Sequence, residues 1–119
     1  MSQKVAKPWG EEIIFTEPNL PYTGKIIRIN AGSRLSLQYH DQKTETIALI
    51  SGTANLAIDK DTKPMDINFG YTIIPNTTHR IEAVTDSVIF EVSTPETGTT
   101  FRLEDDYHRS DENLNNKDL

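Results

Sequence analysis

The stretch from Gly32 to Gly52, GSRLSLQYHDQKTETIALISG, carries the pattern that decides the fold. Polar and apolar side chains alternate before His40 and again after Glu45. This period of two is typical of half-buried β-strands. A glycine stands at each end of the stretch, where a turn would need it. We therefore expect two strands here, folded as a hairpin across the short polar connection at residues 41–44.

Several other short segments have the same character and predict an all-β protein. Isoleucine and threonine are abundant, and β-branched side chains suit a pleated surface. Turn residues separate the expected strands, which cover residues 11–15, 25–29, 53–58, 71–74, 79–84 and 87–93. We expect a polar turn at 59–64, a packing role for Trp9, a C-terminal cover at 96–109 and a flexible tail at 110–119. A chain of 119 residues is enough for one domain, which we place at 1–109.

Composition excludes several classes of protein. The chain has no cysteine, which removes disulfides, thiolate nucleophiles and cysteine-based zinc sites. Its formal net charge is −6, so it is a poor nucleic-acid binder. No apolar run approaches the roughly 20 residues that a membrane helix needs, and the first residues have no signal-peptide hydrophobic region. We expect a cytoplasmic protein without nucleic-acid or membrane partners.

Four side chains in the expected strands form a candidate metal site. Alternation places Gln38 and His40 on the same strand face, and the following strand begins with Glu45. His79 begins a later strand directly after a turn and can supply a fourth group. Two imidazoles, a carboxylate and an amide oxygen can hold a borderline divalent metal and leave positions open for a ligand.

The spacing of these residues resembles a known family. Gly32, Gln38, His40, Glu45 and Gly52 match the first cupin motif, in the variant with glutamine in place of the first histidine. The longer string LSLQYHDQKTETIALISGTANLAI is similar to type II mannose-6-phosphate isomerases and to the C-terminal domain of mannose-1-phosphate guanylyltransferases. Three more segments fit that family: KPWGEE, IIPNTTHRIEA and FRLEDDYHR. The resemblance implies a single-domain cupin, an antiparallel jelly-roll β-barrel.

The resemblance also implies an activity. Enzymes of this type interconvert mannose 6-phosphate and fructose 6-phosphate with a divalent metal, for which zinc is our first expectation and manganese, iron, cobalt or nickel are alternatives. It singles out Lys25, Arg102 and Arg109 as substrate-binding residues. Lys43 and Arg80 are expected to be catalytic, because each lies within three residues of an expected metal ligand. The general base stays open among Lys43, Asp41 and Glu82.

Some positions depart from the family pattern. Thr46 and Lys43 replace the histidine and arginine usual in the isomerases. A different metal-dependent cupin enzyme (an oxygenase, lyase or epimerase) therefore stays an alternative, as does a non-catalytic sugar- or sugar-nucleotide-binding module. Asn68 and Asn76 stand where glycines are usual, and asparagine tolerates the left-handed backbone that such turns need. Sheet edges left open by the fold predict a homodimer.

Overall fold

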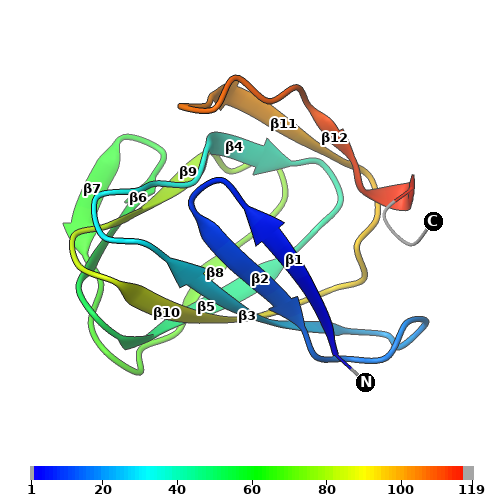
Figure 1. The fold of residues 1–119 in the computed structure, drawn as a ribbon. Coiled ribbons are helices and arrows are strands. Elements are labelled where there is room, and N and C mark those ends of the chain that lie inside the picture. The colour runs from blue at the N-terminus through cyan, green and yellow to red at the C-terminus, as the bar shows by residue number, and fades with distance from the viewer. Residues whose placement is uncertain (1, 117–119) are drawn as a thin grey trace.

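The computed structural model describes residues 2–116, which fold into two antiparallel sheets facing each other (Figure 1). The first sheet has six strands, in the spatial order β1 (Gln3–Lys7), β2 (Gly10–Ile14), β3 (Thr23–Ile29), β10 (Ser87–Ser93), β5 (Glu45–Ser51) and β8 (Tyr71–Ile73). Strands distant in the chain thus lie side by side, as in a jelly roll.

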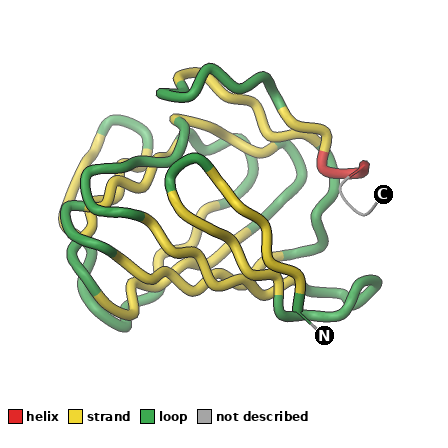
Figure 2. The backbone as a smooth tube through the Cα atoms, in the orientation of Figure 1, coloured by secondary structure: helices red, strands yellow, loops and turns green. Residues whose placement is uncertain are grey.

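The second sheet also has six strands and closes the barrel from the other side (Figure 2). Its order is β12 (Glu112–Asn113), β11 (Thr99–Glu104), β4 (Leu37–His40), β9 (His79–Ala83), β6 (Ala54–Ile58) and β7 (Asp61–Pro64). One 3-10 turn, Leu114–Asn116, follows β12. The all-β prediction is confirmed. The described residues contain no helix of the length and apolar character required to cross a membrane.

The core lies between the two sheets and consists of the inward-facing residues of the strands. Isoleucine and leucine side chains from both sheets are fully buried there, among them Leu56 and Ile89. Trp9 packs against the same cluster, as expected. Each inward position alternates with an outward one, so the strand period decides which side chains reach the interior. The same alternation also points some polar side chains into the barrel.

The structure corrects three boundaries drawn from the sequence. Residues 61–64 form β7, an exposed edge strand paired with β6, where a polar turn was expected. The N-terminal β1 was not expected at all. Part of the expected tail is also ordered, because β12 pairs with β11 and Leu114 is only 4% exposed. Backbone pairing and one buried leucine hold this segment, and neither leaves a periodic signal. Residues 117–119 lie outside the described part of the chain.

The expected hairpin between residues 34 and 50 is also wrong, although both of its strands exist. β4 belongs to the second sheet and β5 to the first. The connection at residues 41–44 therefore crosses from one sheet to the other. Side chains of the two strands meet across the barrel interior rather than along one sheet. The sequence pattern specifies which face of each strand is polar, but it does not specify the pairing partner.

Five of the described non-glycine residues adopt the left-handed backbone: Asn19, Asp59, Asn68, Asn76 and His108. Asn68 has φ 62°, Asn76 has φ 64° and His108 has φ 56°. The prediction that asparagine can replace the usual glycine at positions 68 and 76 is confirmed. Asn76 also donates its backbone N–H to the carbonyl oxygen of His40 at 2.7 Å, which ties this turn to β4.

The two glycines that bracket the central stretch differ in their surroundings, and this gives a test. Both have positive φ, but an alanine Cβ at Gly52 would collide with the Asp86 carbonyl oxygen, whereas at Gly32 it would meet nothing within 4 Å. We expect Gly32→Ala to cost about 1 kcal/mol of unfolding free energy, through backbone strain alone. Gly52→Ala should cost about 3 kcal/mol or more, because strain and collision add. Urea denaturation measures both, and equal losses would contradict the packing described.

Candidate metal centre

Three side chains from three strands converge at one point inside the barrel. His40 ends β4, Glu45 begins β5 and His79 begins β9, and all three are buried. The Nε2 atoms of His40 and His79 lie 3.2 Å and 3.1 Å from the same carboxylate oxygen, Oε1 of Glu45. The ligand atoms of the three residues all lie within 4.8 Å of one another. The two histidines come from neighbouring strands of one sheet, and the carboxylate comes from the sheet opposite.

The outer nitrogen of each imidazole has its own partner. Nδ1 of His40 lies 2.8 Å from the hydroxyl oxygen of Thr100 on β11. Nδ1 of His79 donates to the carbonyl oxygen of Thr77 at 2.9 Å. A carbonyl only accepts, so the proton of a neutral His79 ring is on Nδ1 and its Nε2 carries a lone pair. Such partners orient histidines that bind metals.

The charges of the cluster fit a cation. Burial lowers the pKa of His40, which favours its neutral ring. Burial opposes ionisation of Glu45, but the Lys43 ammonium foremost, together with the contacts of both histidines, holds the pKa of Glu45 well below its usual range. The Nε2 atoms of both imidazoles face the same carboxylate oxygen here. No described residue hydrogen-bonds to the buried Nε2 of His40. A divalent cation among these atoms would satisfy all three ligands.

Gln38 lies beside the cluster, on the strand that pairs with β9. It is the register partner of His79 and lines the same interior cavity as His40 and Glu45. Its amide oxygen accepts a hydrogen bond from the Ser36 hydroxyl at 2.5 Å. The structure thus brings all four expected ligands together, with three of them converging directly. A ligand role for Gln38 stays a prediction.

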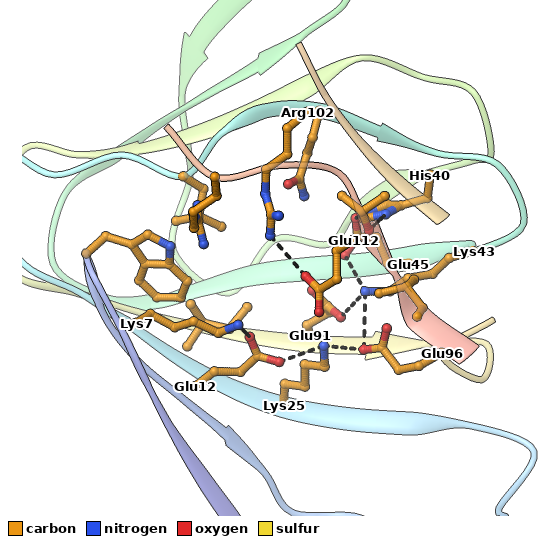
Figure 3. A pocket seen from close by; sticks show the side chains of 17 residues that line it. Lys7, Glu12, Lys25, His40, Lys43, Glu45, Glu91, Glu96, Arg102 and Glu112 are labelled. Atoms are coloured by element: carbon orange, nitrogen blue, oxygen red, sulfur yellow. Dashed lines mark hydrogen bonds and ion pairs between the residues drawn. The ribbon is translucent and has the colours of Figure 1, made fainter. Parts of the chain in front are cut away.

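Two buried lysines and several carboxylates continue the site away from the histidines (Figure 3). Nζ of Lys43 lies 3.0 Å from Glu91 and 3.8 Å from Glu45. Nζ of Lys25 lies 2.7 Å from Glu12. Both ammonium groups also contact Glu96. Because burial penalises unpaired charge strongly, every ionic group in such an interior needs a partner of opposite charge.

These contacts decide the ionisation of the lysines. Burial alone would lower the pKa of Lys43, yet the surrounding carboxylates, Glu91 foremost, raise that pKa above its usual value. The same balance raises the pKa of Lys25 well above its usual value. Lys43 is therefore an ammonium group that can donate a hydrogen bond, and the expectation that it acts as a base is not supported. Burial and the Glu45 charge raise the pKa of Glu91 to about 8.

The interior carboxylates Glu12, Glu91 and Glu96 were not predicted from the sequence. Glu91 could have been found, because it lies two residues after the fully buried Ile89 and therefore on the same face of β10. The other face of β10 is more apolar and suggests the wrong orientation for the strand. Its residues Phe90 and Val92 resemble core residues but are 43% and 56% exposed. For Glu96 no signal existed, because it lies in a loop without periodicity.

Arg80 is not brought to the metal cluster. It follows His79 in β9 and lies on the other face of that strand. Its guanidinium donates to the Leu35 carbonyl oxygen at 2.9 Å and to the Glu104 carboxylate at 2.8 Å. Adjacent strand residues point in opposite directions, and the catalytic role expected for Arg80 from its position in the sequence stays a prediction.

The two C-terminal arginines line the cavity that contains the cluster, as does Lys25. Arg102 donates to Glu112 at 3.0 Å and to the Ser110 carbonyl oxygen at 2.5 Å. Arg109 forms hydrogen bonds to Asp105 at 2.9 Å and 3.1 Å. Each of these cations thus already has a carboxylate partner. Substrate binding by them stays a prediction.

The remaining candidates for the base point elsewhere. Glu82 is exposed on β9. Asp41 accepts a hydrogen bond from the Thr99 backbone N–H at 2.8 Å, which holds it in a connection outside the cluster. The buried carboxylate beside the metal cluster that is not part of it is Glu91.

A family comparison decides the assignment. Residues 1–112 match the family model described as mannose-6-phosphate isomerase, C-terminal. The chain belongs to this family. No curated protein has significant sequence similarity to it.

Solved structures show the same fold. KdgF from Halomonas sp. superposes with a TM-score of 0.70 and 14% identity, over 80% of this chain and 87% of that one. A protein provisionally named a sugar phosphate isomerase, from Acidithiobacillus ferrooxidans, superposes with a TM-score of 0.62 and 15% identity, over 70% of this chain and 56% of that one. Salicylate 1,2-dioxygenase from Pseudoaminobacter salicylatoxidans superposes with a TM-score of 0.68 and 14% identity, over 77% of this chain and 26% of that one.

These similarities establish a cupin fold, since proteins of the cupin superfamily are among the matches. The chain spans most of KdgF but only about a quarter of the dioxygenase. One fold therefore accompanies proteins with differently named activities, and the fold alone does not choose between them.

The hydroxyl partner of His40 provides a test of the metal centre. We expect Thr100→Val to weaken binding of Zn²⁺ about 10- to 100-fold, because removing a group that orients a ligating histidine has that effect. Thr99→Val is the matched control, since Thr99 alternates with Thr100 on β11 and does not contact His40. Competition with a chromogenic chelator measures both affinities. Equal affinities for the two variants would contradict the role given to Thr100.

Proposed function

We propose that this protein is a metal-dependent sugar-phosphate isomerase that interconverts mannose 6-phosphate and fructose 6-phosphate. The observation that carries the proposal is the meeting of the histidine–glutamate cluster with two buried lysines in one cavity, within a chain of the mannose-6-phosphate isomerase C-terminal family. The cluster suits a divalent metal. The lysines suit the anionic end of a sugar phosphate.

Aldose–ketose isomerisation moves a proton between carbon one and carbon two of the sugar, and negative charge develops on oxygen. A divalent metal held by His40, Glu45 and His79 would supply electrophilic stabilisation of that oxygen. Lys43, a buried ammonium group 3.8 Å from Glu45, can donate a hydrogen bond in the same place.

The base that we propose is Glu91. It is buried on β10, its carboxylate is 3.0 Å from Lys43, and it stands next to the cluster without being one of its three converging ligands. It would take the proton from one carbon and return it to the other.

A second candidate function has an observation in its favour. Two histidines and one carboxylate form the ligand set of many iron-dependent oxygenases. The present cluster has that composition. A metal-dependent oxygenase acting on a small polar molecule is therefore the alternative, and tightly bound iron together with oxygen consumption would favour it. Turnover with redox-inert zinc would favour the isomerase.

Proton NMR of the zinc-loaded protein with mannose 6-phosphate in heavy water tests the isomerase directly. We expect fructose 6-phosphate to appear with deuterium at its carbon one, and the reverse reaction to place deuterium at carbon two of mannose 6-phosphate. In the same assay Glu91→Gln should lower kcat about 100- to 10,000-fold, because that is the usual contribution of a general base. Its bound zinc should be unchanged. Glu104→Gln is the control, since Glu104 is exposed and pairs with Arg80 on the outer face.

Two outcomes would contradict the proposal. Absence of turnover with every divalent metal tested would exclude mannose 6-phosphate as the substrate. Full activity of the Glu91→Gln variant would keep the reaction but exclude Glu91 as the base.

A further inference from the structure

The two buried lysines share one carboxylate, that of Glu96. Lys25 is 3% exposed and lies on β3, while Lys43 is 4% exposed and precedes β5. Glu96 contacts Lys25 directly and lies 3.6 Å from Nζ of Lys43. Figure 3 shows its carboxylate between the two ammonium groups. Each lysine also has a second partner, Glu12 for Lys25 and Glu91 for Lys43.

Glu96 differs from the other carboxylates of this network in how it is held. Glu12, Glu45 and Glu91 project from strands of the first sheet, whose backbone is fixed by pairing on both sides. Glu96 lies in the loop at residues 94–98, between β10 and β11. Its side chain is 13% exposed, against 8%, 4% and 6% for the other three. It is therefore the carboxylate that can leave with the least disturbance.

The charges around the lysines make the same distinction. A divalent ion at the histidine cluster and the two lysines would contribute four positive charges. The carboxylates that touch these lysines are Glu12, Glu45, Glu91 and Glu96. Three of them are fixed in strands, and Glu96 is the one that lies in a loop. If Glu96 turned away, positive charge would remain between the lysines and would attract another anion.

The space in the barrel also requires a movable group. The interior cavity measures about 70 Å³. Pockets that enclose small molecules are usually about 300–1,000 Å³. An adjoining groove of about 480 Å³ lies against the N-terminal strands and the 94–98 loop, and it shares Lys7, Glu96 and Glu112 with the interior cavity. Glu96 therefore stands where the groove opens into the metal site.

We propose that Glu96 occupies the seat of the substrate's anionic group, and that an incoming phosphate or carboxylate replaces it between Lys25 and Lys43. The displaced side chain would turn into the groove, where water can solvate it. No bond forms or breaks in this exchange. The inference rests on the proposed function and adds to it the residue against which the anionic group of the substrate competes.

Calorimetric titration with inorganic phosphate tests the exchange. Without a competing carboxylate, Glu96→Gln should bind phosphate about fivefold or more tightly than the wild type, because ion pairs desolvated in an interior are strong. Glu17→Gln is the matched control, since Glu17 lines the same groove and its loss changes the net charge equally. It should bind phosphate like the wild type. Titrations are run with and without Zn²⁺, and circular dichroism verifies the fold of each variant.

Two results would overturn the exchange. One is equal or weaker phosphate binding by Glu96→Gln, and the other is an equal gain in Glu17→Gln, which would make the effect one of net charge. If Glu96→Gln does not fold, Glu96→Asp replaces it. Its shorter side chain keeps the charge but reaches the lysines less well, so its phosphate binding should also exceed that of the wild type. No gain in this variant would refute the exchange.

Titration with a second set of ligands identifies the kind of anionic sugar that the site binds. Mannose 6-phosphate, glucuronate and mannose are titrated into the wild type and into Glu96→Gln. The gain should appear for whichever anionic sugar is bound and be absent for mannose, and an equal gain for mannose would overturn the proposal. Because binding is measured without turnover, failure of the isomerase assay leaves this result intact. If the isomerase assay is positive but Glu96→Gln shows no gain in ligand affinity, the exchange is refuted and the proposed function stands.

Discussion

The carboxylate of Glu45 is the contact on which the rest of the interior depends. One of its oxygens faces a nitrogen of each of two histidines, at 3.1 Å and 3.2 Å, and the other lies 3.8 Å from Lys43. It comes from the sheet opposite to the histidines and so connects the two halves of the barrel. A buried anion requires positive charge nearby. The lysine supplies part of this charge, and a metal ion among the ligands would supply the remainder.

That requirement explains why the barrel contains so many paired charges. Once Lys43 is buried beside Glu45, its ammonium group needs further polar partners, and Glu91 is one of them at 3.0 Å. Lys25 is balanced by Glu12 and Glu96 in the same way. Such a network stabilises the fold little, because desolvation offsets much of the attraction. Its value is chemical: it holds acids, bases and cations at fixed positions around a point where a substrate can bind.

Much of this arrangement could be predicted from the alternation of inward- and outward-facing residues along each strand. Alternation correctly placed His40 and Glu45 inward, and the left-handed turns at Asn68 and Asn76 followed from the conformational tolerance of asparagine. What alternation cannot give is the pairing of strands, so β4 and β5 were expected in one hairpin and lie in opposite sheets. Proximity in sequence likewise suggested that Arg80 joins His79, although neighbouring strand residues face opposite ways. Glu91 was hidden because the apolar side chains next to it, which resemble core residues, face outward.

The central claim is that His40, Glu45 and His79 hold a divalent metal. Elemental analysis of protein equilibrated with Zn²⁺ and then dialysed tests it most directly, with the His40→Ala, His79→Ala double variant measured in parallel. We expect one equivalent of tightly held zinc in the wild type and none in the variant, with both proteins folded. Zinc that is absent from the wild type, or retained equally by the double variant, would contradict the assignment of this cluster as the metal centre.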